Sequence, residues 1–323
     1  MKVAEIIKAR TPEWKELEED IASFRSDGPR KDGFRAVQFA RRYRAICGDL
    51  SLAISMQFPS TTTQYLHQLV ADAHTQLYRA ERFRISQWGR TIFVDVPRRI
   101  LRDPCTWLSF CVFWGLFGGS LLAAMIRDDF AESVVGKESL QQVETMYAHP
   151  LDADLLEDSR AAMTGFYLFN NAGIGLRCFA SGIFLGVGSL MTLSFNAILL
   201  GAIFGHMIKS PSSENFLIFV TAHGPFELTA VVLSGAAGLR LGWSIIDTEG
   251  WSRIESLRRT SPRALEIAGI ATLLFLFAAY IEGAISPSNL PYSAKAAVAV
   301  VSIVILLAYV VILGWMSERR STQ

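Results

Sequence analysis

Long stretches without charged residues constrain the fold of this chain more than any other feature. Five stretches contain almost no charged residues: 105–126, 166–208, 215–247, 264–285 and 294–316. A helix needs about 20 apolar residues to cross a lipid bilayer, and its backbone is hydrogen-bonded internally. Residues 1–104, by contrast, are rich in Arg, Glu and Gln. The sequence therefore predicts an all-α protein, with a helical region over 1–104 and a polytopic transmembrane helix bundle over 105–323.

The N-terminal region is predicted to be a bundle of amphipathic helices that stays in the cytoplasm. Apolar residues recur at helical spacing in four segments: 12–25, 34–57, 61–80 and 81–102. The first residues, MKVAEIIKARTPEWKELEED, lack the apolar core of a signal peptide, so nothing in them directs this end across a membrane. The basic segment 81–102 precedes an apolar span, which favours contact with anionic lipid headgroups over nucleic acid.

Charge asymmetry predicts how the bundle is oriented in the cell membrane. The loop 127–165 is acidic and is expected outside, whereas 248–263 and the tail after 316 carry arginines and are expected inside. An odd number of crossings must then lie between the acidic loop and the first basic loop. Three segments fit: 166–188, 192–208 and 226–246. With the remaining apolar stretches, this gives about six spans and places both termini in the cytoplasm.

The octapeptide NFLIFVTA, residues 215–222, is too short to span a bilayer. It is predicted to dip into the membrane and return as a re-entrant segment, a path that backbone tolerates only where protein or water surrounds it.

Small residues recur four apart in three of the predicted spans. They are Gly182 and Gly186; Ala197, Gly201 and Gly205; and Ser234, Gly238 and Gly242. At this interval small side chains share one helix face and let two backbones approach closely. We expect these three helices to pack tightly together, and we expect such faces to form a homo-oligomer, with a dimer favoured.

Polar and ionisable residues within the apolar region are the candidate site. They are Asn170, Asn171, Arg177, Asn196, His206, His223 and Glu227. Pro225 suits the first turn of a helix, which makes His223 or Gly224 the cap and puts Glu227 beside the positive end of the helix dipole. We expect Glu227 to be neutralised further by Arg177 or by a protonated histidine from a neighbouring segment.

Three interpretations of these residues remain open. They form a hydrogen-bonded lock that fixes the helix register, they bind an ion or proton for transport, or His223 and Glu227 bind a metal or act as acid and base. The last is the least favoured, because only two ligand-type residues adjoin. The four cysteines show no metal-ligand spacing. We therefore expect no catalytic residues, metal or cofactor, and the patterns do not favour an enzyme.

At these same positions the chain resembles the stage II sporulation protein M family. The likeness rests on the paired asparagines, on SGIFLGVGSLMTLSFNAILLGAIFGH and on HGPFELTAVVLSGAAGLRLG, within a core of about 165–247. Ala197 departs from the glycine that the family usually has after Asn196. The motif residues that the resemblance carries over are Asn170, Asn171, Asn196, His223, Gly224, Glu227, Gly238 and Gly242.

The resemblance implies a scaffold, since the founding members sit in the septal membrane of spore formers with partners that degrade peptidoglycan. The chain looks like the longer variety with a cytoplasmic helical region, whose neighbours include a MoxR-type ATPase, von Willebrand A-domain proteins and an RDD membrane protein. We therefore expect an assembly subunit of a cell-envelope complex embedded in the lipid bilayer. The alternative is an ion- or proton-coupled transporter or channel that uses His223 and Glu227.

Overall fold

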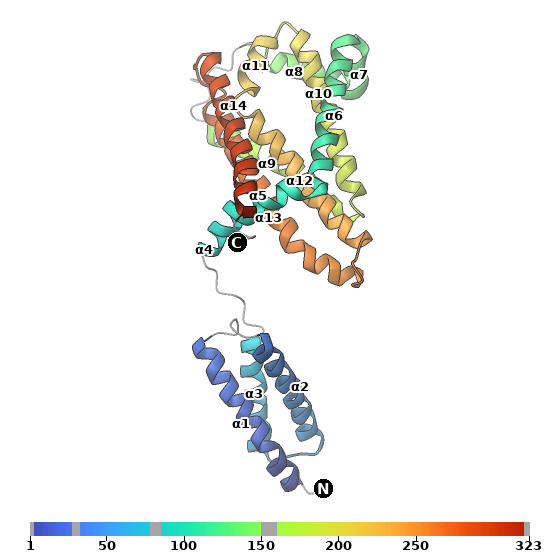
Figure 1. The fold of residues 1–323 in the computed structure, drawn as a ribbon. Coiled ribbons are helices and arrows are strands. Elements are labelled where there is room, and N and C mark those ends of the chain that lie inside the picture. The colour runs from blue at the N-terminus through green and yellow to red at the C-terminus, as the bar shows by residue number, and fades with distance from the viewer. Residues whose placement is uncertain (1–2, 28–32, 78–84, 150–159, 320–323) are drawn as a thin grey trace. The chain divides into compact units, whose positions relative to one another are not determined.

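The computed structural model describes residues 3–27, 33–77, 85–149 and 160–319. Regular structure in these ranges is helical, without a strand, which confirms the predicted all-α class. The chain forms two compact units, residues 1–84 and 85–323, with helices labelled as in Figure 1. The structure thus divides the chain at residue 84, whereas composition suggested a boundary at 104.

The first unit consists of α1 (Val3–Asp27), α2 (Gly33–Ser55) and α3 (Ser60–Leu77). The apolar faces of the three helices meet in a core that includes Trp14, Leu17, Ile21, Phe39, Ile46, Leu66 and Leu69. Asp49 joins α1 to α2, because its carboxylate accepts hydrogen bonds from Trp14 Nε1 at 2.8 Å and from Arg10 Nε at 3.0 Å. Burial, together with a hydrogen bond donated to Glu18, raises the pKa of Tyr65 to about 12.

The segment that follows belongs to the second unit. It comprises α4 (Ile85–Arg90), the π-helical η1 (Thr91–Asp95) and α5 (Val96–Arg102). Val96 and Ile100 are buried in the core of the membrane bundle, and Tyr309 donates a hydrogen bond to the carbonyl of Ile92 at 2.7 Å. These apolar contacts explain why the boundary lies before 85 and not after 102.

Five helices among the described residues are long and apolar enough to cross a membrane. They are α6 (Pro104–Ile126), α10 (Val187–Lys209), α12 (Gly224–Ile246), α13 (Arg253–Ala284) and Tyr292–Met316, which combines α14 (Tyr292–Leu307), η4 (Ala308–Leu313) and the start of α15 (Gly314–Arg319). Helix α13 begins before the predicted span, because the Ser252 hydroxyl caps the backbone N–H of Glu255 and Arg259 pairs with the Glu255 side chain.

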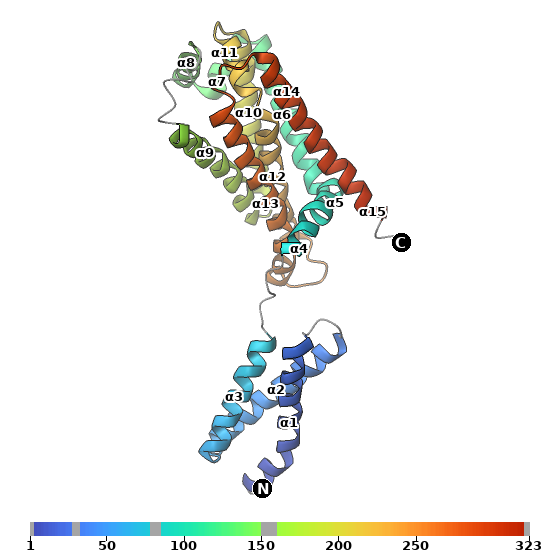
Figure 2. The same ribbon diagram turned by 90° about the vertical axis from the view of Figure 1, so that its left-hand side faces the viewer.

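The sixth predicted span, 166–188, is not among these five helices. Its place is taken by the more polar α9 (Arg160–Ala180) and the short 3₁₀ helix η3 (Ser181–Ile183). Helices α6 and α10 run parallel: Gly201 lies against Phe117, and Lys209 Nζ donates to the carbonyl of Met125 at 3.3 Å. The chain must therefore return between them, and α9 makes this return along α12 and α13 (Figure 2).

The predicted small-residue faces are used within the chain, in two separate contacts. A methyl group added to Gly242 would overlap the backbone of Gly186. One added to Gly238 would meet the backbone carbonyls of Cys178 and Phe179 at the end of α9. Gly186 also has a left-handed backbone, with φ of 78°. Ser234 lies beside Gly175 of α9.

The other contact lies between α10 and α6. Gly201 and Gly205 face the backbone of α6. They do not face the segments that carry the other two predicted small-residue faces. Ser120 reinforces this contact by donating a hydrogen bond to the Ile198 carbonyl at 2.6 Å. Homo-oligomerisation stays a prediction, and it would need a surface other than these faces.

Short helices cover the end of the bundle where α6 and α10 finish: α7 (Asp128–Val135), α8 (Lys137–Met146) and α11 (Ser213–Val220). Tyr147, which follows α8, packs its ring on Phe216 and Phe219 of α11, with centroids 5.3 and 5.7 Å apart. The segment predicted to be re-entrant is therefore mostly this short helix, and its path through a membrane remains a prediction.

Candidate functional site

A cavity of about 250 Å³ lies where α9, α10, α11, α12 and α13 meet. Its polar lining comes from three places in the sequence: Asn170 and Asn171 of α9, His223 and Glu227 at the head of α12, and Glu282 near the end of α13. Apolar side chains such as Phe204, Phe216 and Leu228 complete the wall. The cavity therefore gathers polar groups inside an apolar surround.

The turn between α11 and α12 sets the position of His223 and Glu227. His223 is the cap of α12, as predicted, and its carbonyl accepts from the backbone N–H groups of Phe226 at 3.1 Å and Glu227 at 3.2 Å. Pro225 occupies the first turn, where it removes an N–H that would have no helical partner. Glu227 follows in the same turn, beside the positive end of the helix dipole.

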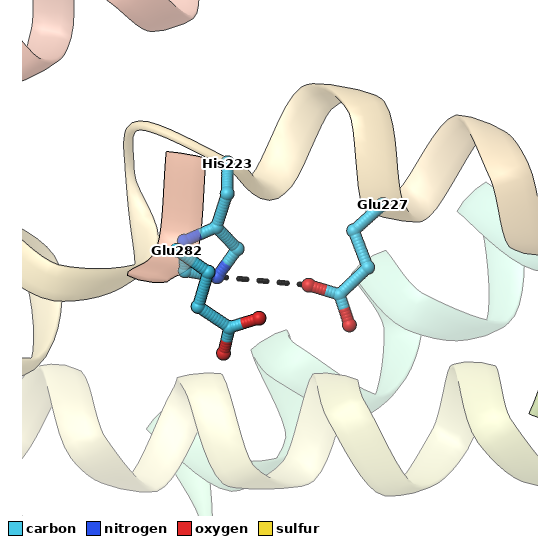
Figure 3. Close-up of side chains that lie close together, drawn as sticks. All are labelled: His223, Glu227 and Glu282. Carbon is cyan, nitrogen blue, oxygen red and sulfur yellow. Dashed lines mark ion pairs between the residues drawn. The ribbon is translucent and has the colours of Figure 1, made fainter. Parts of the chain in front are cut away.

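Three ionisable side chains converge at this point (Figure 3). His223 Nε2 lies 3.6 Å from a carboxylate oxygen of Glu227, and Glu282 reaches the same place from α13. One nitrogen or oxygen atom from each of the three residues lies within 4.8 Å of the other two. His223 and Glu282 are almost fully buried, at 4% and 5% exposure.

A second contact holds the His223 side chain in place from the other side. The Nδ1 atom of His223 lies 2.9 Å from the hydroxyl of Ser286, which leaves Nε2 directed at the carboxylates. The Ser286 carbonyl in turn accepts a hydrogen bond from the buried ammonium group of Lys295 at 2.6 Å. The imidazole is therefore oriented by the segment between α13 and α14.

Glu282 and Lys295 are the residues that the sequence reasoning missed. Both lie in stretches predicted to be apolar spans, 264–285 and 294–316, where the surrounding Leu, Ile, Val and Ala residues outweigh one or two charges. The signal was present, because a single ionisable residue within a membrane span by default marks a functional site.

The structure does not bring all of the predicted site residues together. Asn170 donates a hydrogen bond to the Asn171 side chain at 3.2 Å, and both line the cavity. Arg177, expected as the partner of Glu227, is exposed and is not part of the cavity lining. Glu227 instead lies beside two other ionisable groups, His223 from the same helix terminus at 3.6 Å and Glu282 from α13.

Two further predicted residues make separate contacts. Asn196 donates to the Thr192 carbonyl in its own helix at 2.7 Å. His206 lies 2.7 Å from Glu144 and joins α10 to α8, at a partly exposed position. Within the described part of the chain, no third ligand-type side chain joins this second histidine–glutamate pair.

The chemistry of the buried cluster follows from its donor atoms. One imidazole and two carboxylates can exchange protons, share a proton or hold a cation. Glu282 Oε2 is buried without a hydrogen-bond partner, and the Glu282 carboxylate lies beside the side chains of His223 and Glu227 (Figure 3). No other group of three such ligands occurs in the described part of the chain.

Comparison with known proteins gives matches for both compact units. A family model described as stage II sporulation protein M matches residues 108–287, and a domain of unknown function (DUF8413) matches residues 4–79. The first match includes Glu282 and extends well beyond the motif-bearing core of 165–247. No curated protein and no solved structure matches the chain.

Proposed function

Since the chain belongs to the stage II sporulation protein M family, we propose that it is an assembly subunit of a cell-envelope complex, which anchors partner proteins at the cytoplasmic membrane. The observation that carries this proposal is the division of the chain into two units. A bundle with five apolar helices supplies the anchor, and a separate helical unit with its own core supplies a surface for partners.

The helical unit has a surface suited to binding such partners. Its core residues are used internally, and its outer faces carry arginine–carboxylate pairs such as Arg42 with Asp20 and Glu16. By family resemblance we propose that the partners include a MoxR-type ATPase, a von Willebrand A-domain protein or an RDD membrane protein. A cytoplasmic position for residues 1–84 would make the first two accessible.

Co-purification tests this proposal. The full chain and a variant comprising residues 85–323 are each expressed with the MoxR-type ATPase and von Willebrand A-domain protein of the same genome, and each is purified from membranes. We expect the partner to be retained by the full chain and lost from the shorter variant, while both insert in the membrane. Equal recovery with the two chains, or recovery with neither, contradicts the proposal.

Ion or proton transport is the second candidate, and the cavity lined by His223, Glu227 and Glu282 is the observation that favours it. Carriers with discontinuous helices bind ions at helix termini within the membrane, and α12 begins at such a break. The test replaces Glu227 with Gln and compares ion flux in liposomes with the oligomer size in detergent. Flux that is lost while assembly stays intact supports transport, whereas loss of assembly without flux in either protein supports anchoring.

A further inference from the structure

We propose that His223, Glu227 and Glu282 together bind one divalent transition-metal cation inside the membrane bundle. The inference goes beyond the anchoring role and does not depend on it. It rests on the convergence of the three side chains and on the orphaned carboxylate oxygen of Glu282.

The donor set selects the class of ion. An imidazole nitrogen suits Zn²⁺ and related transition metals, whereas Mg²⁺ and Ca²⁺ prefer sites made of oxygen alone. One imidazole with two carboxylates is therefore a ligand set for Zn²⁺ or Mn²⁺. The three donor atoms lie within 4.8 Å of one another. Two donor atoms bound to one ion, each at about 2.0–2.2 Å from the metal, lie closer together than this limit. One ion therefore fits between the three side chains after small movements of those side chains.

The charge in the cluster supports a cation. The buried carboxylate of Glu282 and the partly buried carboxylate of Glu227 lie beside one imidazole. Burial of unpaired charge is costly unless the charge is paired or bound to a metal. The Lys295 ammonium points to the Ser286 carbonyl. A divalent ion would balance both carboxylates and would also give Glu282 Oε2 the partner that it lacks.

The surroundings have the features of a metal site beyond its direct ligands. A metal-bound histidine usually uses its second ring nitrogen for a hydrogen bond that fixes the ring, and His223 Nδ1 makes this contact with Ser286. The cavity of about 250 Å³ leaves room for water to complete the coordination. Asn170 and Asn171 line the same space and could hydrogen-bond such water.

The pair His206 and Glu144 provides an internal control. It has a shorter nitrogen–oxygen distance than the buried pair, 2.7 Å against 3.6 Å, but it is partly exposed and lacks the second carboxylate. If a histidine beside one glutamate were sufficient for binding, both pairs would bind metal. Our proposal requires the third ligand, and therefore assigns binding to the buried cluster alone.

The test measures metal binding to the full chain in detergent, purified with a tag that contains no histidine. The protein is stripped with a chelator, dialysed against Zn²⁺ or Mn²⁺, and analysed for bound metal by mass spectrometry. We expect about one ion per chain, and a loss of affinity of at least about tenfold for Glu282→Gln and for His223→Gln. His206→Gln and Glu144→Gln are expected to bind metal like the unmodified chain.

A measurement on the unmodified chain keeps the proposal testable if the variants fail to fold. Zn²⁺ or Mn²⁺ bound to the native state must raise the Tm of the stripped protein in a concentration-dependent way, and Mg²⁺ must raise it less. No bound ion and no rise in Tm at about 0.1 mM Zn²⁺ or Mn²⁺ would overturn the proposal. Binding that survives Glu282→Gln in folded protein, or that disappears with His206→Gln, would overturn it as well.

Discussion

Gly242 is the residue at which the packing of the bundle leaves the least room. Its Cα faces the backbone of Gly186, in the turn that connects α9 to α10. Gly269, in the neighbouring α13, has no atom within 4 Å of the position that a methyl group would occupy. The two glycines lie in adjacent apolar helices and differ chiefly in this contact.

Replacement of each glycine by alanine should therefore separate packing from helix propensity. Gly242→Ala is expected to destabilise the bundle by about 1–3 kcal/mol, because backbone must move to make room. Gly269→Ala is expected to be neutral or slightly stabilising, since alanine favours the helix. Thermal unfolding in detergent measures both, and equal Tm values for the two variants would show that the close contact at Gly242 carries no weight.

Asp49 has a corresponding role in the first unit, where it accepts hydrogen bonds from Trp14 and Arg10. Asp49→Ala leaves the partly buried indole N–H and guanidinium without their acceptor, at an expected cost of about 1–3 kcal/mol. Glu19→Ala, at an exposed position of α1, is the control and should cost less than about 0.5 kcal/mol. Chemical denaturation followed by the fluorescence of Trp14 reports on this unit, and a control variant that loses as much stability would refute the assignment.

Sequence reasoning at this scale succeeded where residue type and local position agreed. A histidine, a proline and a glutamate at the start of a helix predicted the cap, and the structure places His223 there. Glu282 escaped because its partners lie more than fifty residues away in the sequence, and no local pattern relates it to His223. Arg177 lies outside the cavity lining, because its residue type and its place in an apolar stretch do not determine which way its side chain faces.

At the scale of single elements, the short helix α11 depends on its neighbours. Eight residues are too few for a stable isolated helix. Tyr147 packs on Phe216 and Phe219, and its carbonyl accepts a hydrogen bond from the Asn215 side chain at 2.9 Å. The position of α11, and through it the turn that carries His223, follows from these contacts.

Tyr147→Ala should consequently loosen α11 without melting the long helices. We expect backbone amide exchange over residues 213–220 to become at least tenfold faster, equivalent to about 1.4 kcal/mol of opening free energy, while α6 keeps its protection. Met146→Ala is the control, because Met146 is adjacent in sequence and 56% exposed. Unchanged exchange in α11 after Tyr147→Ala would contradict the dependence proposed here.

The apolar helices were the part of the fold that the sequence predicted best, since length and hydropathy define a membrane span directly. Predicted and observed bounds differ by five residues or fewer at α6, α10 and α12. The predicted span 166–188 overlaps α9 but extends past its end at Ala180, because the apolar run includes the turn at Gly186, which glycine with positive φ allows. The segment 85–102 was assigned by its charge, although its buried side chains decide which unit it joins.

At the scale of the whole molecule, the chain combines a membrane bundle with a separate helical unit. We propose that α9 is the return pass between the parallel helices α6 and α10, which would give the bundle an even number of passes. With an even number of passes, the two ends of the membrane bundle would lie on the same side of the membrane. We propose, from the positive-inside rule, that residues 1–84 lie in the cytoplasm, where the proposed partners would reach them.

Side-specific cysteine labelling in intact cells tests this central claim most directly. In a chain without its four native cysteines, single cysteines replace the exposed His67, Glu138 and Glu249. We expect a membrane-impermeant reagent to label Glu138→Cys in intact cells, and to label His67→Cys and Glu249→Cys only after the cells are permeabilised. Labelling of His67→Cys in intact cells would place the helical unit outside and contradict the account.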